Sequence, residues 1–122
     1  MRIKEFKFTC AVDGSGDFTE TKSEQIVGRL VAVSVDQGDL DAGSDIVISV
    51  VSTVSGADHT VLTLTNNTGD VLHNIMVEGA ETDGSASVGG NVHPFIEGKL
   101  KIVVDEGGVS KTGTVVAYVD LD

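Results

Sequence analysis

Apolar and polar residues alternate with a period of two in several short segments of this chain. From Phe6 to Val12 every second side chain is apolar, and the residues between them are Lys, Thr and Ala. The same alternation runs through 99–107 and 112–122. Because successive side chains of a β-strand point to opposite faces, these patterns predict strands with one buried face. The first of these strands is expected to span 3–12.

Turn-forming residues separate the other apolar runs. Gly, Asp, Asn and Ser gather between the runs, as they do in tight turns. The segment 80–94 is the longest such stretch, and its small, polar, glycine-rich composition predicts a mobile surface loop. Val71, Ile75 and Val77 are expected to point inward from the strand before that loop. The remaining predicted strands lie at 18–22, 28–36, 45–53, 60–65 and 71–79.

The apolar run "GRLVAVSVD", residues 28–36, allows two interpretations. Thr21 followed by Glu24 resembles a helix capping box, which would start a helix just before the run. However, Gly28 would then lie inside the helix, at a cost of about 1 kcal/mol. The valines of the run alternate cleanly, so we expect a strand, with at most a short turn of helix near Ser23. Its nearly continuous apolar character predicts an inner strand that is partly covered on both faces.

Length and composition describe one domain, residues 1–122. Hydrophobic residues make up 40% of the chain, aromatic residues only 4%, and Trp is absent, so Val, Ile and Leu must build the core. Roughly seven to nine short strands with turns between them are typical of an antiparallel sandwich or barrel. The single Cys, Cys10, allows no internal disulfide and is expected to be a small buried apolar residue.

The distribution of charge excludes one large class of partners. The net charge is −11, and no Lys or Arg occurs from Leu30 to Gly98, a stretch that holds ten acids. Proteins that bind nucleic acid need Lys and Arg to neutralise phosphates, so we expect no nucleic-acid partner. Charges interrupt the N-terminal segment, and we expect neither a secretory signal nor a membrane span.

The acidic segments raise the question of a cation site. Asp13, Ser15 and Asp17 alternate as ligands do in a calcium loop, but the sixth position holds Phe18 instead of glycine. We therefore interpret 13–17 as a hairpin turn. The aspartates of the acidic stretch at 36–45 are read as a solvated loop, and whether an ion binds at either place is left open.

Other catalytic and cofactor patterns are missing from the sequence. His59, His73 and His93 do not pair with one another or with Cys at metal-ligand spacing. The glycine pairs do not link a strand to a helix, so they match neither a phosphate loop nor a nucleophile elbow. We expect no catalytic residue, no metal and no cofactor, and we interpret the sequon at 66–68 as a turn.

Four segments taken in order carry a family likeness: "GRLVAVSVD", "DIVISV", "TVLTLTNNTGD" and "PFIEGKLKIVVDEGGVSKTGTVVAYVD". In these segments the chain resembles a widespread family of small all-β virion proteins of tailed bacteriophages. The likeness begins at Gly28 and covers roughly three quarters of the chain. Near "VLHNIMVEG" the chain lacks the aromatic and proline residues that the family leads one to expect.

The resemblance implies a capsid decoration, or cement, protein with a jelly-roll-like antiparallel β-sandwich. Such a protein would be made in the host cytoplasm and would lie on the capsid exterior of the virion. Its partners would be the major capsid protein and copies of itself, as a homo-dimer or homo-trimer, with no nucleic acid and no membrane. The basic first strand is the expected docking edge, with Arg2, Ile3, Lys4, Phe6 and Lys7 as contact residues.

Two alternatives remain open at the level of sequence. The first is another virion component, such as a sandwich associated with the tail, neck or fibre. The second is a module that binds carbohydrate or a cell surface. Sugar-binding faces usually present aromatic platforms, whereas this chain has Tyr118 as its single Tyr and no Trp.

Overall fold

The protein is built from β-strands. The computed structural model describes residues 2–80 and 87–122, with the backbone alone described at 77–80 and 87–91. Within those ranges there is no helix, including at Ser23, and no segment that could cross a membrane as a helix. The strands are β1 (Ile3–Ala11), β2 (Phe18–Thr21), β3 (Ile26–Asp36), β4 (Ser44–Val51), β5 (Asp58–Asn67), β6 (Val71–Asn74), β7 (Val77–Ala80), β8 (Ser87–Val92), β9 (Phe95–Asp105) and β10 (Thr112–Asp120).

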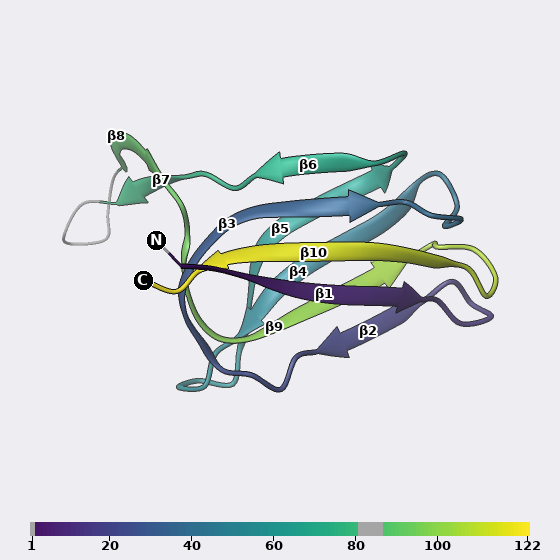
Figure 1. Ribbon diagram of the computed structural model, residues 1–122, viewed down its shortest axis with the longest axis horizontal. Coiled ribbons are helices and arrows are strands. Elements are labelled where there is room, and N and C mark those ends of the chain that lie inside the picture. The colour runs from purple at the N-terminus through teal and green to yellow at the C-terminus, as the bar shows by residue number, and fades with distance from the viewer. Residues whose placement is uncertain (1, 81–86) are drawn as a thin grey trace.

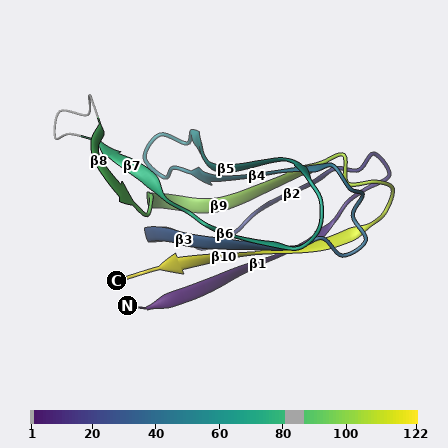
Figure 2. The same cartoon turned by 90° about the horizontal axis from the view of Figure 1, so that it is seen from above.

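Eight of the strands form two antiparallel layers. One layer has the order β1-β10-β3-β6 and the other β2-β9-β4-β5, and Figure 2 shows the two layers edge-on. Every connection among these eight strands, apart from the β4–β5 turn, carries the chain from one layer to the other. This is the double Greek key of a jelly roll, so the predicted all-β, jelly-roll-like sandwich is confirmed.

The two layers are joined at one corner. The first part of β3 pairs with the first part of β9, from Ile26↔Gly98 to Arg29↔Phe95, and the rest of β3 pairs with β10. β9 must therefore bend sharply to continue into the other layer. Gly98 lies at this bend with a φ of 133°, a backbone conformation that residues other than glycine rarely adopt.

The core lies between the layers and follows the period-two patterns. The inward side chains of β9 and β10 are buried as the alternation predicts. A bulge between Tyr118 and Val119 shifts the register of β10 against β3, and Leu30 and Val33 are both buried beside it. The fully buried large side chains are Phe8, Ile26, Leu30, Ile46, Ile48, Leu100, Ile102, Val33, Val35, Val104, Val115 and Val119.

The segment after β6 differs from the prediction. Ile75 is buried as expected and Val71 is half-buried, but the strand ends at Asn74. The side chain of Val77 lies outside the described residues. Residues 81–86 of the expected loop at 80–94 lie outside the described residues, but 87–92 form β8, which pairs with β7 in a separate two-stranded ribbon. The prediction was wrong there because glycine-rich strands carry almost no periodic signal, and pairing with a neighbour defines them instead.

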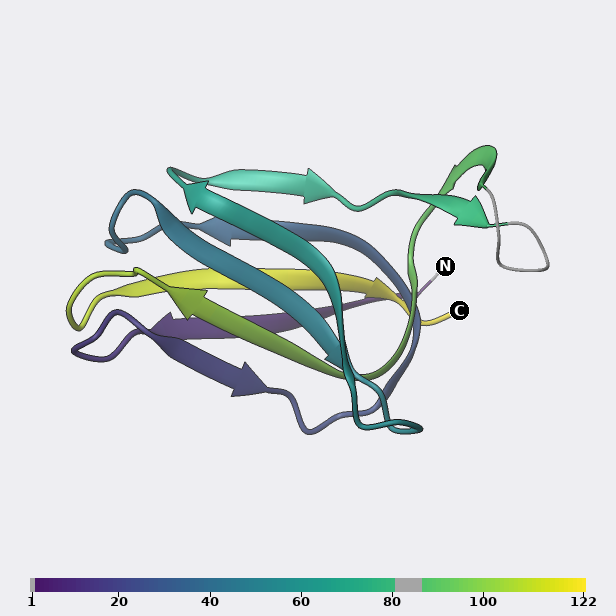
Figure 3. The same cartoon turned by 180° about the vertical axis from the view of Figure 1, so that it is seen from behind.

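The sandwich has two dissimilar ends, which Figures 1 and 3 show from opposite sides. We call one the terminal end, because β1 begins there, β10 ends there and the β7–β8 ribbon projects from it. We call the other the loop end. It carries the β1–β2, β3–β4, β5–β6 and β9–β10 turns.

Candidate interaction surface

The outer face of the β1-β10-β3-β6 layer carries an apolar hollow of about 350 Å³. We call its five lining residues the outer patch. Ile3 and Leu72 are 42% and 60% exposed, and together with their apolar neighbours they form a patch rather than isolated exposed side chains. The patch draws on all four strands of the layer and consists of Ile3, Val31, Ala32, Leu72 and Tyr118.

The local sequence explains why these side chains face outward. Ala32 pairs with Tyr118, and the next aligned pair is Leu30 with Val119, so Val31 is the extra residue of the bulge. Val31 and Ala32, the two residues of β3 that face outward at the bulge, are therefore both apolar, where alternation would usually place a polar residue. The near-continuous apolar character of "GRLVAVSVD" reflects this arrangement: one face meets the core and the other contributes to the outer patch.

A second apolar group, the corner patch, consists of the exposed Val27 and Phe95 and the half-buried Leu121. It surrounds a hollow of about 250 Å³ at the corner where β3 meets β9. Val27 and Phe95 are 64% and 62% exposed. Leu121 and Ile3 also line a shared shallow depression, so the two patches adjoin at the terminal end. The other residues lining that depression are charged: Arg2, Lys4, Glu5 and Glu24. Arg29, which lines the corner hollow, donates from Nη1 to the His93 carbonyl at 3.1 Å.

The structure divides the five expected contact residues of the first strand. Ile3 belongs to the outer patch, and the exposed Lys7 lies on the same face of β1, four residues further along the chain. Phe6 is buried in the core, so its side chain holds β1 in place. Lys4 lies on the same side as Phe6, with Nζ 5.3 Å from the ring centroid. Exposed Arg2 accepts a backbone hydrogen bond from Leu121 at 2.9 Å.

The free edge of β1 is already occupied in part. Lys4 Nζ binds both carboxylate oxygens of Glu24, at 2.6 and 2.8 Å. Lys22 Nζ donates to the Lys7 carbonyl at 2.5 Å and also binds Glu20. These contacts use backbone and charge that a docking strand would need, so β1 contributes to the candidate surface through its outer face rather than its edge.

The loop end is acidic. Among the described residues near it there is one basic side chain, Lys111, which binds Asp41 at 2.6 Å. Backbone bonds brace the turns against one another, including Gly107 N to the Gly16 carbonyl and Asp41 N to the Gly107 carbonyl. The acids of this end are Asp13, Asp17, Asp36, Asp39, Asp41, Asp45, Asp70, Asp105 and Glu106.

The first acidic turn is organised by its own carboxylate. Asp13 Oδ1 accepts from the backbone N–H groups of Asp17 and Ser15, at 3.1 and 2.8 Å, and these bonds lower the pKa of Asp13. The pKa of Asp17 is raised, mainly by a hydrogen bond with the neighbouring carboxyl of Asp105. The Asp13 geometry is that of an Asx turn, in agreement with the turn interpretation of 13–17.

Three acids at this end are close enough to hold a cation. Oxygen atoms of Asp45, Asp105 and Glu106 lie within 4.8 Å of one another. Asp45 and Asp105 are aligned across the β4–β9 ladder, which explains why their separation in sequence hid this group. No histidine joins it in the described part of the chain. Two of the three acids are exposed, and exposed acidic groups are common without an ion, so we assign no ion to this group.

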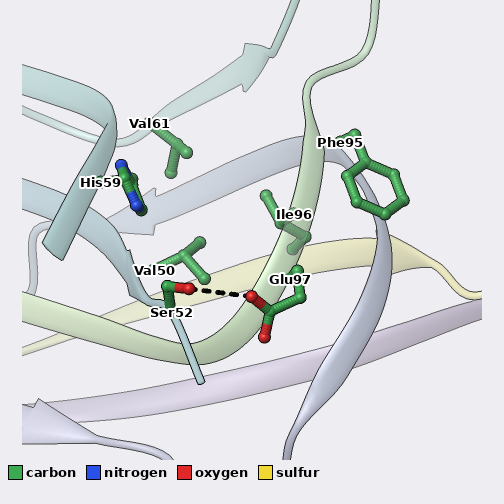
Figure 4. A pocket seen from close by; sticks show the side chains of 7 residues that line it. All are labelled: Val50, Ser52, His59, Val61, Phe95, Ile96 and Glu97. Carbon is green, nitrogen blue, oxygen red and sulfur yellow. Dashed lines mark hydrogen bonds between the residues drawn. The ribbon is translucent and has the colours of Figure 1, made fainter. Parts of the chain in front are cut away.

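A hollow of about 220 Å³ opens beside the start of β5 and combines Ser52, His59 and Glu97 (Figure 4). These residue types also form hydrolytic triads, in which the serine hydroxyl bonds to the histidine. Here the Ser52 hydroxyl donates to Glu97 Oε1 at 2.9 Å instead. Thr53 donates to Glu97 Oε2 through its backbone N–H at 3.1 Å and through its hydroxyl. Glu97 thus anchors the β4–β5 turn, and the relay of a triad is not formed.

No family model and no curated protein matches the chain. The core of Drosophila NLP, whose structure is described in terms of pentamer formation and histone binding, is 13% identical over 99% of this chain and 100% of that chain, with a TM-score of 0.37.

Two infectious bursal disease virus structures also align with nearly the whole chain at 16% identity. They are the Gx strain, with a TM-score of 0.21, and the VP2 subviral particle, with a TM-score of 0.25. The chain covers 38% and 37% of those viral chains, which are therefore much longer. At such scores none of these similarities supports an argument about function.

Proposed function

We propose that this protein is a non-enzymatic structural component of a phage particle, a decoration or cement protein that binds the major capsid protein on the outer surface of the head. The observation that carries the proposal is the polarity of the molecule. The two apolar patches lie on the outer face of one layer and at the terminal end, whereas nine of the nineteen acids gather at the loop end, where Val109 is the exposed apolar residue. A protein that covers a surface needs this division.

The apolar side supplies the binding energy. Contiguous exposed apolar patches on small soluble proteins usually mark interaction sites. The outer patch and the corner patch meet at Ile3 and Leu121, so one partner can cover both. Arg2 and Arg29 lie at the same end, but so do Glu5, Glu24 and Asp122, and Arg2 Nε is 3.9 Å from Asp122. This arrangement favours a partner surface that is apolar at its centre and carries charges of both signs at its rim.

The acidic side supports an outward orientation. With the terminal end against the shell, the loop end projects into solvent, and its carboxylates keep neighbouring particles apart by like-charge repulsion. The sequence likeness to small virion proteins of tailed phages agrees with this placement. The hydrogen bonding of Ser52 to Glu97 gives no support to a hydrolase.

Binding to purified undecorated heads tests the proposal. The wild-type protein is expected to co-sediment with the heads. Leu72→Glu places a charge in the outer patch and is expected to weaken binding at least tenfold, about 1.4 kcal/mol. Val109→Glu is the matched control, since Val109 is 68% exposed and lies in the β9–β10 turn of the loop end.

Three outcomes count against the proposal. One is the failure of the wild-type protein to co-sediment, and another is normal binding by Leu72→Glu. The third is immuno-gold label on the tail or neck instead of the head, which would favour the alternative virion role. A strong hit in a glycan screen, lost in Leu72→Glu, would favour a carbohydrate-binding module.

A further inference from the structure

The edges of the two layers are protected to different degrees. β2 and β6 are edge strands of only four residues each, and short edges offer little to a pairing strand. β1 is longer, but its edge carries Lys4, Glu5 and Lys7, and Lys22 occupies the Lys7 carbonyl. Charges and bound side chains of this kind keep other strands away.

β5 lacks these protections. It is a ten-residue strand that ends the β2-β9-β4-β5 layer, with β4 as its single strand neighbour in the described chain. Its only charged residue, Asp58, stands at the start and is bound by Lys101 at 2.8 Å. From His59 to Asn67 there is no acid in a chain whose net charge is −11. Two copies can therefore meet along this strand without opposing carboxylates.

The core is also open along β5. Leu62 and Leu64 pack against the core but stay half-buried, because no described strand lies beyond β5 at this edge of the layer. They pair with Ile48 and Ile46 in regular register. Between them, Thr63 points to the opposite, solvent-exposed face.

We propose that β5 pairs with β5 of a second copy, antiparallel and about a two-fold axis at Thr63. This register places Leu62 opposite Leu64 of the other copy, twice, and so closes the open flank of both cores. Thr63 meets its own counterpart on the exposed face. Antiparallel pairing of identical strands is self-complementary, so it produces a closed dimer and a continuous eight-stranded layer.

The bulges of β5 limit the strength of this contact. The register against β4 shifts on both sides of the 62–64 tract. Bulges interrupt edge pairing, so the new ladder is short. The interface is correspondingly small, and we expect dissociation in the range of about 100 µM, as is typical of weak contacts. The pairing uses a surface separate from the outer patch, and it stands or falls independently of the proposed function.

Analytical ultracentrifugation over a concentration series tests the pairing directly. The wild-type protein is expected to convert from monomer to dimer with rising concentration. Thr63→Lys adds a charge at the axis and should leave a monomer with an unchanged circular dichroism spectrum and melting temperature. Thr9→Lys makes the same change at the exposed β1 edge and should leave dimerisation intact.

Cross-linking gives a second measurement that does not depend on a variant that weakens the dimer. Thr63→Cys should form a covalent dimer with an oxidant or a short bis-maleimide, since residues opposed at the axis lie about 5 Å apart. Thr19→Cys lies on the exposed side of the far edge strand β2 and should stay monomeric. A wild-type protein that stays monomeric up to about 1 mM, a trimer, or a Thr63→Lys variant that still dimerises would overturn the inference.

Discussion

Gly98 offers the sharpest test of how the two layers are joined. It lies where β9 leaves its pairing with β3 and enters its pairing with β4. A Cβ built on Gly98 would stand 2.1 Å from the Val51 carbonyl oxygen, and its φ is 133°. Gly98→Ala therefore adds one methyl group at a point where the backbones of two strands approach each other closely.

Two costs determine the size of the effect. An alanine in this backbone region stores about 1–3 kcal/mol of strain. The contact distance is far below the 3.0 Å that real Cβ atoms keep, so the backbone must shift, and overpacking of this kind costs about 1–3 kcal/mol. The sum is about 4 kcal/mol, a large part of the 5–15 kcal/mol that stabilises a typical domain. For a chain of this length, that loss lowers the melting temperature by about 15 °C.

Thermal and urea unfolding followed by circular dichroism measure this loss. Gly14→Ala is the control, because Gly14 has open space around its Cβ position and no positive φ. We expect Gly14→Ala to change the free energy of unfolding by less than about 0.5 kcal/mol. If Gly98→Ala unfolds at the same temperature as Gly14→Ala, then β9 does not approach Val51 as closely as described. The described junction of the two layers would then be wrong as well.

Three further predictions concern single side chains and the net charge. Hydrogen bonds from Thr53 and Ser52 hold the pKa of Glu97 below its ordinary 4.5, so Glu97 stabilises the fold above that pH and loses this effect as the pH falls through the lowered value. Glu97→Gln should therefore melt earlier than wild type at about pH 7, and the gap should close in acid; a gap that persists there refutes the assignment. Burial raises the pKa of Cys10 to about 12, so a thiol reagent should label it only in denaturant, and rapid labelling of the folded protein would contradict its buried position. Raising NaCl from about 0.02 to 0.5 M should raise the melting temperature by screening repulsion at the loop end, and no change would mean that this repulsion is negligible.

Local pattern predicted most of the strands but not their partners. The alternation in Phe95–Asp105 and Thr112–Asp120 depends on which side chains face the core, and that information is local. The alternating valines correctly predicted a strand rather than a helix at 28–36, although the strand begins two residues earlier, at Ile26. By contrast, the meeting of Ile26 with Gly98 depends on the path of the whole chain, which no short segment encodes.

The candidate surface was predictable only in part. The basic first strand drew attention to Ile3, which does lie in the outer patch. Leu72 and Tyr118 were missed because their exposure depends on the order of the strands, and a bulge decides the position of Val31. Phe6 was counted among the contact residues because it lies close to them in sequence. Its spacing of two residues from Phe8 and four from Cys10 already indicated that all three side chains share the buried face.

The pairing of β1 with β10 determines how the molecule responds to force. Ile3 is aligned with Asp120, so both chain ends leave the fold side by side. A pull applied between them separates the two strands one rung at a time, like a zipper, instead of shearing all rungs together. Tension between the two chain ends is therefore expected to unfold the protein at low force. Compression perpendicular to the two layers would instead be resisted by the whole packed core.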